Sequence, residues 1–168
     1  QVIVHLAAET GTGQSMYEIE KYVDVNIKGT SIMLDILTNE EHKVEKIVVA
    51  SSRAIYGEGK YSCSKHGIVY PEARKVEDMD KGDFEVKCPI CGSDVKICAT
   101  TEDSKILPSS IYGITKKAEE DMCITVGKSI GIPVVVFRFQ NVYGPGQSLK
   151  NPYTGILSIF SKIGRAHV

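Results

Sequence analysis

The sequence predicts an α/β fold built on a doubly wound parallel sheet, with a cysteine-rich insertion. Apolar, β-branched runs of strand length alternate with two long helical patterns along the chain. The order strand, helix, strand, helix, strand favours parallel pairing through right-handed crossovers. Four of the five cysteines fall in one segment of about fifty residues that shows neither pattern.

The predicted elements follow from local signals. QVIVHLAAETG is a buried strand that turns at Gly11 and Gly13, and a helix over residues 15–41 follows, with Ser15 as its N-cap. KIVVASS is the second strand. IYGITKKAEEDMCITVGKSIG is a second helix between a serine cap, Ser110, and a glycine stop, Gly131. PVVVFRFQNVYGPG is a third strand that ends in a Gly/Pro turn.

The division of the chain follows from these elements. Residues 1–57 and 108–162 form the sheet-containing core, and residues 58–107 form the insertion, which needs its own scaffold. Ligands of doubly wound sheets bind beyond the carboxyl ends of the strands. The three strand exits LAAETG, ASSRAIYG and FRFQNVYG are therefore the predicted walls of a site.

The insertion carries two pairs of candidate metal ligands. Cys63 and His66 form a C-x-x-H pair, and Cys88 and Cys91 form a C-P-I-C pair, the spacing found in zinc ribbons. Such a Cys3His set is closed, so a zinc ion there is predicted to be structural. Cys98 is the rival fourth ligand. The fifth cysteine lies alone on an apolar helix face and is predicted to be a buried core thiol.

A tyrosine four residues ahead of a lysine occurs four times, so the spacing alone identifies nothing. Three of the pairs are Tyr17/Lys21, Tyr56/Lys60 and Tyr61/Lys65. Only Tyr112 and Lys116 begin a capped helix that follows the strand ending in Ser52. An ammonium about 4 Å from a phenol contributes about 4 kcal/mol at an effective dielectric constant of 20. That interaction would lower the tyrosine pKa from about 10 towards 7, as a general base requires.

The chain contains four motifs in this order: VIVHLAAETGTGQSM, VVASSRAIYG, YGITK and FRFQNVYGPGQ. Together they resemble the extended short-chain dehydrogenase/reductases, in the NAD-dependent nucleotide-sugar epimerase and dehydratase branch. The resemblance covers residues 1 to about 161 outside the insertion and implies part of a Rossmann-like domain. It implies that Tyr112 is the catalytic base, that Lys116 lowers its pKa and binds the nicotinamide ribose, and that Ser52 hydrogen-bonds the reacting hydroxyl.

The resemblance also implies binding residues. Asn141 matches an asparagine that contacts the nucleotide diphosphate of the substrate, and Ser52 serves the substrate as well. The residues matched to NAD binding, beside Tyr112 and Lys116, are Leu6, Ala7, Ala8, Asn26, Ser51, Phe139 and Gln140. For Asn26 a helix-packing role stays open.

The reaction expected from the resemblance is 4-epimerisation of a nucleotide sugar. The 4,6-dehydratases of this branch carry an Asp-Glu pair directly after the active-site Ser/Thr, whereas this chain has Arg53 and Ala54. Transient oxidation at the fourth carbon needs no net redox change, so one NAD suffices. Sequences of this branch that carry a similar cysteine insertion include dTDP-L-rhamnose 4-epimerases. A reductase or dehydratase, and a non-catalytic, zinc-ordered binding module on a Rossmann scaffold, stay open.

Composition restricts the partners. Of 168 residues 42% are hydrophobic, and 20 basic against 21 acidic side chains leave a net charge of -1, which predicts no nucleic-acid partner. No apolar run reaches the roughly 20 residues that span a bilayer. We expect a cytoplasmic protein without membrane contact, and the resemblance adds a homodimer formed through the two long helices.

Both ends depart from the family pattern. The family's G-x-x-G-x-x-G turn for the dinucleotide pyrophosphate would precede residue 1, and its C-terminal substrate domain would follow the last motif. The chain is therefore expected to be a fragment, inactive alone. The last six residues, IGRAHV, match the translation of a common sequencing adapter, so residues 163–168 are predicted to be a non-native tail.

Overall fold

The structure is a computed structural model that describes residues 1–147 and residue 160. The predicted non-native tail, residues 163–168, lies outside the described residues, as does most of the segment 148–162. Among the helices of the described part, none combines the length and apolar character that a membrane span requires.

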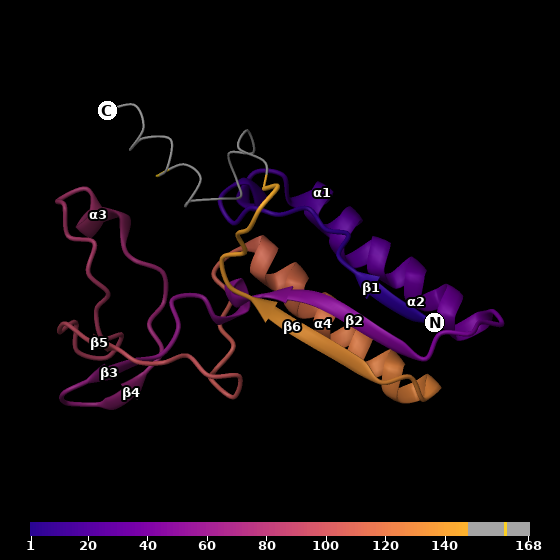
Figure 1. Cartoon of the computed structure of the whole chain (residues 1–168). Coiled ribbons are helices and arrows are strands. Elements are labelled where there is room, and N and C mark those ends of the chain that lie inside the picture. The colour runs from indigo at the N-terminus through magenta and orange to yellow at the C-terminus, as the bar shows by residue number, and fades with distance from the viewer. Residues whose placement is uncertain (148–159, 161–168) are drawn as a thin grey trace.

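The core sheet has three parallel strands in the order β1-β2-β6 (Figure 1). These are β1 (Val2–His5), β2 (Lys46–Ser52) and β6 (Val134–Phe139). The pairing is continuous along β2, from Ile47 opposite Val134 to Ser52 opposite Phe139. The predicted strands and their parallel pairing are thus confirmed. The central strand is β2, in which Ile47 and Val49 are fully buried.

The first crossover is broken, where the sequence predicted one helix. It consists of η1 (Gln14–Met16), α1 (Ile19–Tyr22), a π-helical segment η2 (Val23–Lys28) and α2 (Gly29–Asn39). The prediction that Ser15 caps the helix is wrong, because Ser15 lies inside the 3-10 turn and its hydroxyl donates to the Thr12 carbonyl at 2.7 Å. A π-helical turn of this kind is often found at functional sites.

The second crossover helix, α4 (Ile111–Ile130), has the predicted ends. The Ser110 hydroxyl accepts a hydrogen bond from the Gly113 amide at 3.1 Å, which satisfies one of the free N–H groups of the first turn. Gly131 ends the helix in the left-handed conformation at φ 73°. Both local signals therefore act as the sequence indicated.

The hydrophobic core lies between one face of the sheet and the helices α2 and α4 (Figure 1). Its buried members are Leu34, Leu37, Ile47, Val49, Cys123 and Ile132. Cys123 is fully buried, as predicted, and burial raises the pKa of its thiol to about 11. On the other face of the sheet, Val4 and Phe137 are 58% and 49% exposed.

The insertion forms a second unit with its own small antiparallel sheet, ordered β4-β3-β5 (Figure 1). Its elements are β3 (Tyr61–Cys63), β4 (Gly67–Val69), α3 (Val76–Met79) and β5 (Lys96–Ile97). A separate cluster of buried residues holds it together: Tyr61, Cys63, Val69, Val86 and Cys88. So few apolar residues make a small core, and a bound metal would add to the stability of this unit.

Candidate functional site

The carboxyl ends of the three core strands lie at one edge of the sheet. Ser52 ends β2 opposite Phe139, the last residue of β6, and His5 ends β1 opposite Val49. Leu6 follows directly and is 64% exposed at this edge. The predicted site walls thus lie at the same edge of the sheet, because parallel strands all point their carboxyl ends towards one edge.

Tyr112 reaches this edge because the start of α4 packs closely against the chain that leaves β2. That chain forms a 3-10 turn, η3 (Arg53–Tyr56). A Cβ atom at Gly113 would lie 2.6 Å from the Ala54 carbonyl oxygen, so only glycine permits this approach. The Tyr112 amide also donates to the Ser15 hydroxyl at 3.0 Å. Ser15, which does not cap the helix as predicted, therefore holds the backbone of Tyr112, the residue predicted to be the base.

The side chain of Tyr112 lies between two elements. Its ring meets the ring of Tyr22 edge-on, with centroids 6.3 Å apart and an interplanar angle of 81°. Burial raises the pKa of the Tyr112 phenol above its ordinary value. Hydrogen bonding with Ser52 lowers that pKa, and the negative charge of Glu119 raises it further. Ser52, which caps η3, thus lies near enough to Tyr112 to affect its pKa.

Lys116 is engaged elsewhere, and here the structure differs from the sequence-based expectation. Its ammonium group donates to the Glu119 carboxylate at 2.7 Å, and the two side chains are 3% and 0% exposed. The ammonium was expected to lower the pKa of the Tyr112 phenol, whereas burial raises that pKa. A lysine at i and a glutamate at i+3 meet on one helix face, which explains the competition.

Asn26 is fully buried and its side chain braces three segments. Its amide nitrogen donates to the Thr115 hydroxyl at 2.9 Å and to the Glu9 carbonyl at 3.2 Å, and its amide oxygen accepts from the Glu9 backbone N–H at 2.8 Å. These bonds join the π-helical turn, the loop after β1 and the helix turn between Tyr112 and Lys116. The packing role that the sequence left open for Asn26 therefore has direct support.

The remaining predicted binding residues lie along the strand exits. Phe139 is 41% exposed at the end of β6, and Leu6 is exposed at the end of β1. Ala7, Gln140 and Asn141 are exposed, and Ala8 is half-buried. Ser51 is buried, and its hydroxyl donates to Glu120 at 3.0 Å, so this side chain faces the helix side of the sheet. Their roles in binding stay predictions.

The other three Tyr/Lys pairs lie in different surroundings. Tyr17 is 90% exposed, and Lys21 pairs with Glu18 at 3.2 Å. Tyr56 and Tyr61 are buried, one in η3 and the other in the small core of the insertion. Context within the fold, rather than the spacing, distinguishes the pair at the head of α4.

A polar network that the sequence did not indicate links the insertion to the core. Arg138 donates two hydrogen bonds to the Glu120 carboxylate, at 2.7 and 3.2 Å. It also donates to the Tyr56 hydroxyl at 2.5 Å and to the backbone carbonyl of Glu102, in the insertion, at 2.7 Å. These contacts, led by Glu120, raise the pKa of Arg138 and keep it charged. Long-range pairs of this kind leave no local pattern in a sequence.

We expect the substitution Tyr56→Phe to weaken this link. It removes the hydroxyl that accepts from Arg138, and a hydrogen bond to a charged group is worth about 1.5–3 kcal/mol. Urea unfolding followed by circular dichroism should show a loss of about that size. Tyr17→Phe is the matched control, because that side chain is 90% exposed. Equal stability of the two variants would contradict the assigned link.

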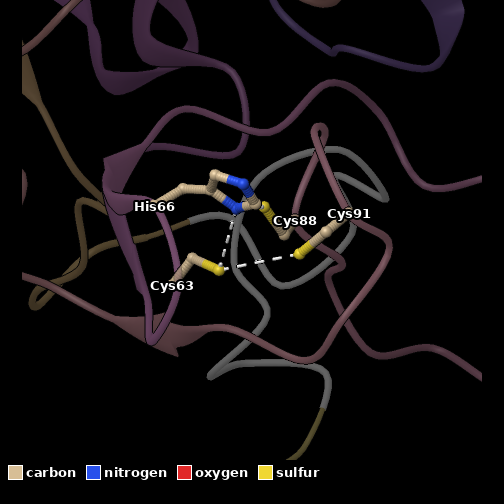
Figure 2. Close-up of side chains that lie close together, drawn as sticks. All are labelled: Cys63, His66, Cys88 and Cys91. Carbon is tan, nitrogen blue, oxygen red and sulfur yellow. Dashed lines mark hydrogen bonds between the residues drawn. The ribbon is translucent and has the colours of Figure 1, made fainter.

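Four predicted metal ligands of the insertion come together in one group (Figure 2). The ligand atoms of Cys63, His66, Cys88 and Cys91 all lie within 4.8 Å of one another. Cys63 and His66 flank the turn between β3 and β4, while Cys88 and Cys91 lie in a second turn that is closed by the Gly92 amide and the Cys88 carbonyl at 2.9 Å. The two halves of the group thus come from two tight turns.

The geometry of this group matches that of a tetrahedral zinc site. Zinc–sulfur bonds of about 2.3 Å and zinc–nitrogen bonds of about 2.0 Å place ligand atoms of a tetrahedron about 3.5–3.8 Å apart. The sulfur atoms of Cys63 and Cys91 are 3.8 Å apart, and Nδ1 of His66 is 3.6 Å from the sulfur atoms of Cys63 and Cys88. The four residues can therefore hold a metal ion.

The rival fourth ligand lies outside this group. Cys98 is half-buried and its thiol contacts the Lys96 carbonyl at 3.8 Å. Within the group, contact with Ser93 lowers the pKa of the Cys91 thiol to about 6, so this ligand forms a thiolate readily. His66, rather than Cys98, completes the candidate metal site.

Comparisons with known proteins agree with this architecture. The NAD-binding family model described as "Male sterility protein" matches residues 1–166. The dTDP-L-rhamnose 4-epimerase of Burkholderia thailandensis is 38% identical over 165 residues, which is 98% of this chain and 44% of that protein. The dTDP-D-glucose 4,6-dehydratase of Dictyostelium discoideum is 26% identical over 87% of this chain and 27% of its own length.

Solved structures give the same picture. The UDP-glucuronic acid 4-epimerase of Bacillus cereus, in complex with UDP-glucuronic acid and NAD, has a TM-score of 0.59 and 26% identity, and the match covers 89% of this chain and 36% of that chain. The UDP-glucose 4-epimerase of Thermotoga maritima, with UDP-glucose, has a TM-score of 0.65 and 26% identity, over 96% and 40% of the two chains. The chain thus spans less than half of the length of each of these proteins.

Proposed function

Because the chain belongs to the extended short-chain dehydrogenase/reductase family of NAD-dependent nucleotide-sugar epimerases and dehydratases, we propose that it carries the catalytic core of a nucleotide-sugar 4-epimerase. The observation that carries this proposal is the close packing of Gly113, next to Tyr112, on Ala54, two residues after Ser52, at the carboxyl edge of the parallel sheet. A phenol and a hydroxyl at that edge suit proton transfer at a sugar hydroxyl.

The residues after Ser52 favour epimerisation over dehydration. Elimination of water needs an additional acid and base, and the dehydratases of the branch have an Asp-Glu pair there. Arg53 and Ala54 occupy these positions, and neither can act as a carboxylic acid. A 4,6-dehydratase or a reductase therefore remains the second candidate.

In the proposed mechanism, the Tyr112 phenolate removes the proton of the sugar 4-hydroxyl, and Ser52 donates a hydrogen bond to the same oxygen. The ammonium of Lys116 stabilises the phenolate. NAD, when bound, would supply the hydride acceptor and donor for the fourth carbon of the sugar. Tyr112 then gives the proton back to the oxygen, so that no net oxidation occurs.

The residues present suit the nicotinamide end of NAD. An ammonium can donate three hydrogen bonds, and the ammonium of Lys116 makes one, to Glu119, within the described structure. The oxygens of a ribose diol are suitable acceptors for such donors. Leu6 and Phe139 expose apolar surface on either side of Ser52, as a nicotinamide ring requires. We propose that Lys116 holds the ribose, with Leu6, Ala7, Ala8, Phe139 and Gln140 around the ring.

The substrate we propose is a dTDP-linked 6-deoxyhexose of the L-rhamnose type, with Asn141 at its diphosphate. Support comes from the Burkholderia thailandensis relative, at 38% identity over 98% of this chain. Homologous structures that bind UDP-sugars keep UDP-linked substrates open.

We also propose that the Cys3His group binds a structural zinc ion, in the manner of a zinc ribbon. All four positions of a tetrahedron are filled by protein ligands, so no position remains for a reacting water. The metal would order the insertion and take no part in the sugar chemistry.

A homodimer of the complete protein is a further part of the proposal. Two isoleucines of α2, Ile32 and Ile36, are 51% and 56% exposed, and Ile114 of α4 is 49% exposed. Apolar side chains at these positions would suit a four-helix contact between two copies. A cytoplasmic location stays a prediction.

An assay of the complete gene product tests the reaction. Purified protein is expected to retain NAD and to interconvert a dTDP-sugar and its 4-epimer without consuming added NADH, as followed by NMR of the sugar. Stoichiometric oxidation of NADH would indicate a reductase instead, and formation of a 4-keto-6-deoxy sugar would indicate a dehydratase. Parallel reactions with UDP-sugars define the nucleotide preference.

A further inference from the structure

The helix that carries Tyr112 also buries a carboxylate which the proposed mechanism does not use. Glu119 is fully buried, and its Oε2 accepts a hydrogen bond from the Lys116 ammonium at 2.7 Å. Its other oxygen, Oε1, is buried and has no hydrogen-bond partner in the described part of the chain. Lys116 therefore pairs with one oxygen of the carboxylate, and the other oxygen has no partner within the described residues.

Such an arrangement is unfavourable as a purely structural device. Burial of two charges costs more than their attraction returns unless additional hydrogen bonds complete the pair. An unpaired carboxylate oxygen makes the balance worse, and burial does raise the pKa of Glu119. An unsatisfied buried polar group in a native protein calls for an explanation, and a catalytic role is one of those known.

The charges around Tyr112 indicate what this pair affects. Glu119 raises the pKa of the phenol, and Ser52 at the end of β2 lowers it. Tyr22 of α1 faces the ring and is uncharged at neutral pH, with a raised pKa. His5 of β1 is held neutral by burial and by the charge of Lys116. Glu119 is thus the negative charge that opposes formation of the phenolate.

We propose that Glu119 is a positioning residue that holds the Lys116 ammonium at its own carboxylate until Lys116 turns to the nicotinamide ribose. The proposal rests on the proposed function, in which Lys116 binds that ribose. Before the cofactor binds, the negative charge of Glu119 offsets the positive charge of the ammonium, so Lys116 stabilises a phenolate only weakly and Tyr112 stays protonated. The base is thereby formed only in a site that is ready for hydride transfer.

The competition has a thermodynamic consequence. If Lys116 must leave Glu119 in order to bind the cofactor, the pair weakens cofactor binding by the free energy of the broken interaction. Removal of the carboxylate charge should therefore strengthen NAD binding, because Lys116 no longer has to leave Glu119. It should also lower the Tyr112 pKa, because a negative charge that opposes the phenolate is lost. A carboxylate that only held the fold together would produce neither effect.

The test uses the near-isosteric substitution Glu119→Gln in the complete gene product. The pKa of Tyr112 is measured in NAD-free protein from the 13Cζ resonance of labelled tyrosine, assigned by its loss in Tyr112→Phe. We expect the substitution to lower that pKa by about one unit, and to tighten NAD binding about 3- to 10-fold by calorimetry.

Asp121→Asn is the matched control. It removes one negative charge from the same helix, at a side chain that is 60% exposed and paired with Lys117. Water and salt screen that charge, so the pKa of Tyr112 and the affinity for NAD should not change measurably. An unchanged or raised Tyr112 pKa in Glu119→Gln, or weaker NAD binding, would overturn the proposal.

A second measurement avoids the risk that Glu119→Gln does not fold. In the unsubstituted protein, the 13Cδ resonance of Glu119 reports its ionisation. Loss of Lys116 leaves the buried carboxylate unpaired, so NAD addition should make Glu119 take up a proton and raise its pKa; no change refutes the competition. Absence of NAD binding by the unsubstituted protein would instead count against the proposed function, while the Tyr112 pKa in cofactor-free protein would still test the effect of Glu119.

Discussion

Replacement of Tyr112 by phenylalanine is expected to lower epimerase turnover of the complete gene product by about 10²- to 10⁴-fold, the usual contribution of a general base. The substitution removes only the hydroxyl, and the edge-on contact with the Tyr22 ring can persist. NAD binding should therefore change by no more than a few-fold. Turnover is measured by NMR of the sugar, and NAD binding by calorimetry.

Tyr17→Phe is the control for this experiment. It makes the same chemical change at a tyrosine that also precedes a lysine by four residues, but the Tyr17 side chain is 90% exposed. Turnover of this variant should equal that of the unsubstituted protein. If Tyr112→Phe kept more than about a tenth of the turnover, Tyr112 could not be the base.

Loss of a metal ligand is expected to have the second large effect. Cys88 is 2% exposed and belongs both to the proposed zinc site and to the small core of the insertion. We expect Cys88→Ser to weaken zinc binding by more than about 100-fold, beyond the loss caused by removal of an outer-sphere partner. Metal analysis should give one zinc per chain before the substitution and little after it.

The insertion should unfold locally when the metal is lost. Structural zinc sites contribute directly to folding, so limited proteolysis should then cut between residues 58 and 107 while the sheet core persists. Cys98→Ser is the matched control, since Cys98 lies in the same insertion but outside the Cys3His group. Equal zinc content in the two serine variants would exclude the proposed ligand set.

The sequence by itself determined the local elements and the ligand pairs. The three strands and both ends of α4 agree with the sequence-based prediction, because β-branched runs, the Ser110 cap and the Gly131 stop act over a few residues. The pairs Cys63/His66 and Cys88/Cys91 were also visible, because each pair lies in a single turn and zinc ligands have restricted spacing.

Only the tertiary structure decided how distant groups compete and pair. The first crossover breaks into four segments, and the Ser15 hydroxyl accepts from the backbone amide of Tyr112, 97 residues away, rather than capping its own helix. Arg138 is joined to the insertion through the Glu102 carbonyl. Neither contact has a local sequence pattern, since each depends on how the crossovers pack.

The same limit applies at the proposed base. The spacing of Tyr112 and Lys116 predicted an ammonium that acts on a phenol, and helix geometry allows that contact. It equally allows Lys116 to reach Glu119, and the fold buries the carboxylate beside it. The sequence predicted Tyr112, and not Glu119, as the partner of Lys116. Burial decided between them, because in an interior of low dielectric constant an ammonium binds the nearest carboxylate rather than a neutral phenol.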